Sequence, residues 1–147
     1  MRSLLTFVAA CVVLIGCATP TSKAPLPPDV KIEAPSAALP ENVKGLSGKW
    51  VGQWINSRTR MDHVLIVESV DASSATAIYS IGEPSDSFTN IQPSWRRVKA
   101  TVGPGTLEFS FPNGAAVNYK LQADGTLAGT YKSRGFDTTA KMTRTPV

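Results

Sequence analysis

The stretch TLEFSFPNGAAVNYKLQADGTLAGTYKS, residues 106–133, decides the fold of this protein. It contains three runs in which apolar and polar residues alternate, separated by Pro112-Asn113-Gly114 and by Ala123-Asp124-Gly125. Alternation with a period of two is typical of a β-strand that buries one face. Three-residue loops that end in glycine commonly join antiparallel strands, because glycine accepts the left-handed backbone of the last loop position. The stretch therefore predicts three antiparallel strands in succession.

The apolar residues and the loops predict the same pairing between these strands. If the apolar side chains share one face, each loop must contain three residues, and the position of glycine in each loop favours that same length. A large ring opposite a glycine also gains the space that it needs. The predicted pairs are Phe111 with Ala115, Leu121 with Leu127, Tyr119 with Gly129 and Val117 with Tyr131.

Similar alternation recurs from residue 45 onward, so we expect residues 45–147 to form one all-β domain. Short turns join most of the runs, and short turns make neighbouring strands antiparallel. A sheet of eight such strands exposes two edges unless it closes on itself. We therefore predict a small antiparallel up-and-down eight-stranded barrel, with an open β-sandwich as the alternative. The predicted strands are 48–55, 62–70, 74–81, 95–102, 106–111, 115–122, 126–133 and 138–144.

Alternation within these strands points most of the aromatic residues into the barrel. Such bulk either fills a small barrel or lets the polar ends of tyrosine and tryptophan orient a ligand. The longest irregular stretch, residues 82–94, is predicted to lie over one mouth, where its apolar side chains either meet a ligand or simply tuck the loop against the barrel. The ligand-binding candidates are Trp54, Tyr79, Phe88, Ile91, Tyr119 and Tyr131.

The first and last predicted strands carry a pattern that resembles the calycin superfamily, the lipocalins and their relatives. Gly48-Lys49-Trp50 looks like the Gly-x-Trp of that family, and Arg144 stands where the family's barrel-end arginine packs over the tryptophan. The resemblance implies that Gly48, Trp50 and Arg144 close one end of the barrel. It also implies a calycin-like barrel that binds a small apolar or amphipathic molecule.

The amino-terminal residues resemble the signal of a bacterial lipoprotein. A short positive start is followed by an apolar run, residues 4–15, that is too short to cross a membrane as a helix. The run ends in the lipobox-like Leu14-Ile15-Gly16-Cys17. The resemblance implies that residues 1–16 are a cleaved signal peptide and that Cys17 carries the lipid. Because Ala18 follows, it also implies an outer-membrane lipoprotein that faces the periplasm.

Residues 17–44 contain the lipidated amino terminus and six prolines, which oppose both helix and sheet. We expect a disordered, semi-rigid linker that holds the barrel away from the membrane. Val30-Lys31-Ile32 could add a short edge strand.

Composition and motifs argue against several functions. The chain has 15 Lys+Arg and 11 Asp+Glu, and its densest basic cluster is residues 95–99. This cluster is expected to form a solvated strand face, with contact to anionic lipid or polysaccharide as the alternative, and not a nucleic-acid site. His63 is the only histidine and is expected to lie exposed at a strand edge, with no partners for a metal site. Cys17 would be the one cysteine left after cleavage, which excludes a disulfide. Without a catalytic motif we expect no enzyme activity, no metal and no cofactor.

Two functions remain from the sequence. The first is a lipid-anchored envelope protein whose barrel binds a small apolar or amphipathic ligand. The alternative is an interaction module that binds a protein partner or a cell-wall polymer through its outer surface.

Overall fold

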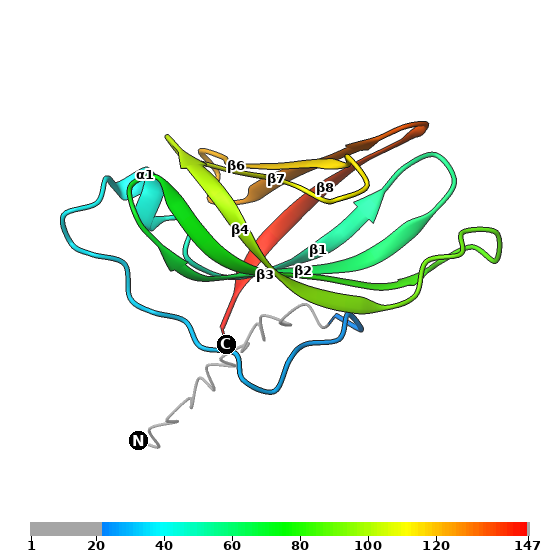
Figure 1. The fold of residues 1–147 in the computed structure, drawn as a ribbon, viewed down its shortest axis with the longest axis horizontal. Coiled ribbons are helices and arrows are strands. Elements are labelled where there is room, and N and C mark those ends of the chain that lie inside the picture. Colours follow the sequence, from blue (N-terminus) through cyan, green and yellow to red (C-terminus); the bar gives the residue numbers. More distant parts are fainter. Residues whose placement is uncertain (1–21, 147) are drawn as a thin grey trace, which may run out of the picture.

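The computed structural model describes residues 22–146, which contain an eight-stranded antiparallel barrel (Figure 1). Each strand pairs with the next along the chain, and the last strand pairs with the first. The predicted all-β up-and-down barrel is therefore confirmed, and the open sandwich is excluded. The strands are β1 (Gly48–Ile55), β2 (Arg60–Val70), β3 (Ser74–Pro84), β4 (Ser94–Gly103), β5 (Thr106–Ser110), β6 (Ala116–Leu121), β7 (Leu127–Ser133) and β8 (Phe136–Thr145).

The register of the second half agrees with the prediction from the sequence. Leu121 pairs with Leu127, Tyr119 with Gly129 and Val117 with Tyr131. The amide of Phe111 donates to the carbonyl of Ala115 at 2.8 Å, which closes the first of the two loops. Gly114 and Gly125 have φ angles of 82° and 79°, so each loop uses its glycine in the left-handed conformation.

The barrel interior is a single apolar core. A methyl group on Gly129 would lie 2.9 Å from the Trp54 ring, so the absence of a side chain there lets the rings of Trp54 and Tyr119 pack over the strand. Most aromatic residues of the strands lie in this core, as the alternation predicts. Its large members include Trp50, Trp54, Tyr79, Leu107, Phe109, Phe111, Tyr119, Leu121, Leu127, Tyr131 and Met142.

The two ends of the barrel differ. At one end the short helix α1 (Glu41–Lys44) and the residues after it cover the core, with Val43 and Leu46 buried. The β1–β2, β3–β4 and β7–β8 connections lie at the other end, which we call the open end; Figure 1 shows α1 at the left and the β3–β4 connection at the right. Helix α1 lies within the segment predicted to be a disordered linker.

The residues before α1 run along the outside of the barrel, from the open end towards the covered end. The amide of Lys23 donates to Asp62 at 2.8 Å, and the Ser80 hydroxyl donates to the carbonyl of Pro25. Further along, the amide of Glu33 donates to the carbonyl of Glu68 at 2.7 Å. We call residues 22–39 the arm.

An apolar patch on the outer face of β1, β2 and β3 lies beneath the arm. Side chains of the arm pack on this second, smaller cluster, which consists of Val51, Val64, Ile66 and Ile78 together with Ala24, Val30 and Ile32. The structure thus differs from the expected disordered linker over residues 22–44. Strands that carry apolar side chains on both faces need cover on both faces, and the arm covers the outer one. Residues 30–32 do not form the edge strand considered above.

Candidate functional site

Arg144 lies over Trp50 at the covered end of the barrel. Its guanidinium carbon lies 4.4 Å from the centre of the indole ring, and the guanidinium donates to the carbonyls of Ser47 and Gly45. The indole N–H of Trp50 donates to the carbonyl of Leu46 at 3.0 Å. Burial lowers the pKa of Arg144 from its usual value, but the group remains a cation.

Gly48 makes this closure possible. Its φ of 114° is one that side-chain-bearing residues rarely adopt, and a Cβ there would lie 2.7 Å from Nη1 of Arg144. The predicted contact between Trp50 and Arg144 is therefore present, and Gly48 provides the space for it. This end is closed by the packing of Arg144 over Trp50.

His63 is buried in the barrel, so the prediction that it lies exposed at a strand edge is wrong. It has the same inward orientation as Leu65 and Val67 on β2, and its ring stacks on Trp54 with 4.8 Å between ring centres. Nδ1 lies 2.7 Å from the carbonyl oxygen of Ser80, and Nε2 lies 2.7 Å from the hydroxyl oxygen of Tyr119. A carbonyl can only accept, so Nδ1 carries the proton and Nε2 accepts from Tyr119.

Burial lowers the pKa of His63 to about 4, and the hydrogen bond to Ser80 opposes this only in part. The imidazole is therefore neutral near pH 7. Burial also raises the pKa of the Tyr119 hydroxyl, which stays protonated. Because both ring nitrogens already have partners, His63 serves the core and is not free to act as a base or to bind a metal.

Two adjoining hollows open at the other end of the barrel, and together we call them the mouth. The outer hollow has a volume of about 420 Å³ and the deeper one about 70 Å³. Tyr79, Ile81, Ile91 and Tyr131 line both. Trp54 and Phe136 line only the deeper hollow, whereas Arg96 and Phe111 line only the outer one.

Polar groups without hydrogen-bond partners lie among the aromatic walls of the mouth. The indole N–H of Trp54, a residue only 1% exposed, is buried and has no acceptor. It lies near the hydroxyl of Tyr79, close enough to influence the pKa of that group but without the geometry of a hydrogen bond. The guanidinium carbon of Arg96 lies 4.9 Å from the centre of the Phe111 ring, and no described acidic side chain pairs with it.

The sequence-predicted ligand-binding residues lie in three different places. The structure brings Trp54, Tyr79, Ile91 and Tyr131 together at the mouth. Tyr119 lies deeper, completely buried against His63. Phe88 points into solvent with 94% of its surface exposed, because Asp86 caps the turn that carries it. The irregular connection is also shorter than expected, since β3 continues to Pro84 and β4 begins at Ser94.

Sequence reasoning missed Arg96 as a residue of the mouth. Its neighbour Arg97 faces outward as predicted and donates to Glu68 at 2.8 Å, while also pairing with Asp29 of the arm at 3.0 Å. Arg96 pairs with Tyr79 across the β3–β4 ladder, so it lies on the inner face of β4. The alternation of β4 contained this information, because Arg96 shares its parity with Val98 and Ala100.

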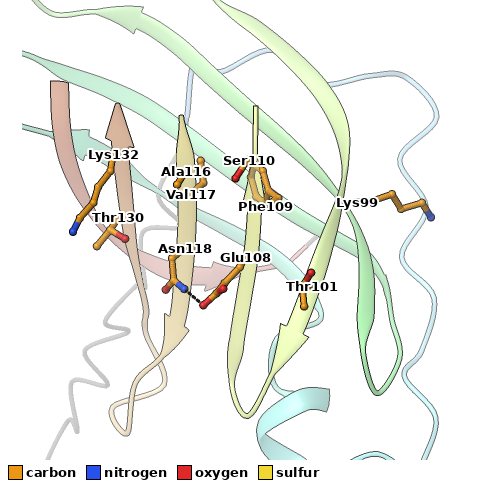
Figure 2. Close-up of a pocket in the computed structure, with 10 residues that line it drawn as sticks. All are labelled: Lys99, Thr101, Glu108, Phe109, Ser110, Ala116, Val117, Asn118, Thr130 and Lys132. Carbon is orange, nitrogen blue, oxygen red and sulfur yellow. Dashed lines mark hydrogen bonds between the residues drawn. The ribbon is translucent and has the colours of Figure 1, made fainter. Parts of the chain in front are cut away.

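A third hollow, of about 610 Å³, lies on the outer face of β4 to β7 (Figure 2). β4 and β5 pair through only three residue pairs, from Thr101–Glu108 to Gly103–Thr106, so the two strands diverge beside it. Lys99 and Lys132 flank the hollow, and Asn118 donates to Glu108 at 2.6 Å within it.

Over residues 22–146 no group of three His, Cys, Asp or Glu side chains could hold a metal ion. In the same part of the chain no helix has the length and apolar character needed to span a membrane. Leu14-Ile15-Gly16-Cys17 lies outside the described residues. No family model, curated protein or solved structure matches this chain.

Proposed function

We propose that the barrel binds a small amphipathic molecule in its mouth. The observation that carries the proposal is that Trp54, whose buried N–H has no acceptor, lines an aromatic hollow. A buried donor without an acceptor is costly, and a bound molecule that supplies the acceptor removes that cost. Concave, mostly apolar sites with a few polar groups are the usual form of ligand pockets. The proposed role is binding without catalysis, on a barrel of calycin-like type.

Two substitutions in the β3–β4 connection test this role. Ile91→Trp would fill the mouth, because Ile91 lines both hollows. Phe88→Trp is the matched control, since that side chain is exposed and lies three residues away. Native mass spectrometry of the protein isolated from the cells that produce it should show a bound small molecule in the wild type and in Phe88→Trp, but not in Ile91→Trp. A wild-type protein that carries none, and binds none when offered, would contradict the proposal.

We further propose that the protein is anchored in the cell envelope through lipid on Cys17, at the outer membrane and facing the periplasm. The lipobox-like residues support this proposal. Growth with a labelled fatty acid should label the wild type and leave Cys17→Ser unlabelled. An unlabelled wild type would refute the anchor without bearing on the mouth.

The hollow on the outer face of β4 to β7 favours a second candidate function, the binding of an envelope partner. Lys132 flanks this hollow and is the residue chosen for the test. Arg97, in the basic cluster of β4, is less suitable because it is already paired with Glu68 and Asp29. If this candidate function holds, crosslinking in cells should capture a partner that is lost in Lys132→Glu and retained in Lys31→Glu, a change at an exposed lysine of the arm. Equal capture by the two variants would remove this candidate.

A further inference from the structure

The polar groups of the mouth are mainly hydrogen-bond donors. The Trp54 indole offers only an N–H, and the Arg96 guanidinium offers five donors and a positive charge. Burial raises the pKa of the Tyr79 hydroxyl, so that group also keeps its proton and can donate. Ser94, Asn113 and Thr138 add neutral groups, and no carboxylate lines either hollow. The lining of the mouth therefore carries a positive charge and no negative one.

The donors come from neighbouring side chains on the inner face of the barrel. Arg96 of β4 is the direct pairing partner of Tyr79 on β3, and the ring centres of Trp54 and Tyr79 are 6.5 Å apart. The ring centres of Tyr79 and Phe111 are 5.1 Å apart, and Arg96 lies on the Phe111 ring. Arg96 thus reaches over the same aromatic wall whose inner end holds the Trp54 N–H.

We infer that the mouth takes a molecule with a carboxylate head group, seated between the Arg96 guanidinium and the Tyr79 and Trp54 donors. The inference rests on the proposed binding function and specifies the class of ligand. A carboxylate has two oxygens with four acceptor positions, which suits a planar guanidinium on one side and single donors on the other. A flat apolar body would then pack along Phe111, Ile91 and Tyr131, in a hollow with room for one or two rings.

A matched pair of probes tests the head group. 2-Naphthoate and 2-naphthamide share the same rings and differ in the negative charge. The full-length protein in lipid nanodiscs, titrated calorimetrically against an empty-nanodisc blank, should bind the naphthoate at least tenfold more tightly than the amide. Arg96→Met should abolish this preference and leave amide binding within about twofold. Arg134→Met, which removes the same charge from the exposed β7–β8 turn, should keep the preference.

The Trp54 N–H gives an independent readout. Its NMR signal can be assigned by its loss in Trp54→Phe, and naphthoate should move it downfield while leaving the indole N–H of Trp50, already bonded to Leu46, in place. Equal affinities for the two probes, or an unchanged preference in Arg96→Met, would overturn the carboxylate inference and leave the proposed function standing. A wild type that binds neither probe, and whose bound molecules are unaffected by Ile91→Trp, would overturn both.

Discussion

Nε2 of His63 accepts a hydrogen bond of 2.7 Å from the hydroxyl of Tyr119, a residue 56 positions away in the chain. The bond crosses the barrel interior from β2 to β6 and ties the two halves of the sheet together. It also fixes the tautomer of the imidazole, because the proton sits on the nitrogen that faces Ser80. Because this buried histidine is neutral and both of its ring nitrogens are hydrogen-bonded, the stability of the barrel depends on pH.

The first prediction concerns that pH dependence. The pKa of His63 is about 4 in the barrel and 6.5 when unperturbed, so between these values the unfolded chain binds a proton that the native state does not. The free energy of unfolding should therefore fall as the pH drops through this window, by about 3 kcal/mol in total. Urea denaturation at a series of pH values measures it.

His63→Gln is the control for this effect, since glutamine does not titrate. Its stability should be flat between pH 6.5 and 5. The carboxyls of Asp71, Asp86 and Asp124 have pKa values lowered to about 2 by nearby hydroxyl and amide donors, so their contributions are lost only at lower pH. A variant that keeps the wild-type slope would show that His63 is not its source.

The second prediction compares the loss of a hydrogen-bonded tyrosine hydroxyl with the loss of one that has no hydrogen bond. Tyr119→Phe should lower the free energy of unfolding by about 1–3 kcal/mol, because it leaves Nε2 of His63 buried without a donor. Tyr131→Phe removes a hydroxyl for which the structure shows no hydrogen bond and should cost less than about 0.5 kcal/mol. Denaturation midpoints of the two variants give the comparison, and equal losses would contradict the role of the His63 bond.

The third prediction concerns the closure of the covered end. Arg144→Lys keeps the charge but loses the planar contact with Trp50 and one of the two carbonyl bonds, so it should destabilise the barrel by about 1–2 kcal/mol. Arg134→Lys, in an exposed turn, should change stability by less than about 0.5 kcal/mol. Thermal unfolding of both proteins provides the test. No difference between them would mean that the stacking on Trp50 contributes little.

The fourth prediction concerns the arm. Arg97 joins Glu68 of β2 to Asp29 of the arm, so Arg97→Met should loosen the arm and speed tryptic cleavage after Lys31 several-fold. Lys99→Met, two residues further along the same outer face, should leave the rate unchanged, because the Lys99 ammonium donates to Thr76 of β3 and not to the arm. Peptide masses over a time course report the cleavage, and equal rates in the two variants would show that Arg97 does not hold the arm.

The second half of the barrel could be predicted in detail because two local signals agree there. Gly114 and Gly125 fix the loop lengths, and the alternating apolar residues fix the face, so a shifted register would violate both. These register inferences need only residues whose spacing is set by the strand itself. The contact of Trp50 with Arg144, which joins the first strand to the last, was implied instead by the resemblance to the calycin pattern.

His63 and the arm could not be predicted in this way. Val64 to Val67 is apolar without interruption, so the sequence of β2 does not show which parity faces inward, and a polar residue at its start was assigned to solvent. The run is continuous because the arm covers one face and the barrel interior the other. Prolines exclude regular structure from the arm, but they do not prevent it from packing as an extended chain. The unpartnered polar groups of the mouth could not be predicted either, because their hydrogen-bond partners depend on contacts between strands that are distant in sequence.

The hydrogen bond from Lys23 to Asp62 limits how far the barrel can stand from an attached lipid. It fixes the start of the arm at the open end, six residues after Cys17. Six residues span at most about 20 Å when fully extended, whereas a free 27-residue spacer could reach about 80 Å. If Cys17 carries acyl chains, the open end is confined to a thin layer next to the headgroups. Molecules leaving the bilayer there would then have only a short path to the mouth.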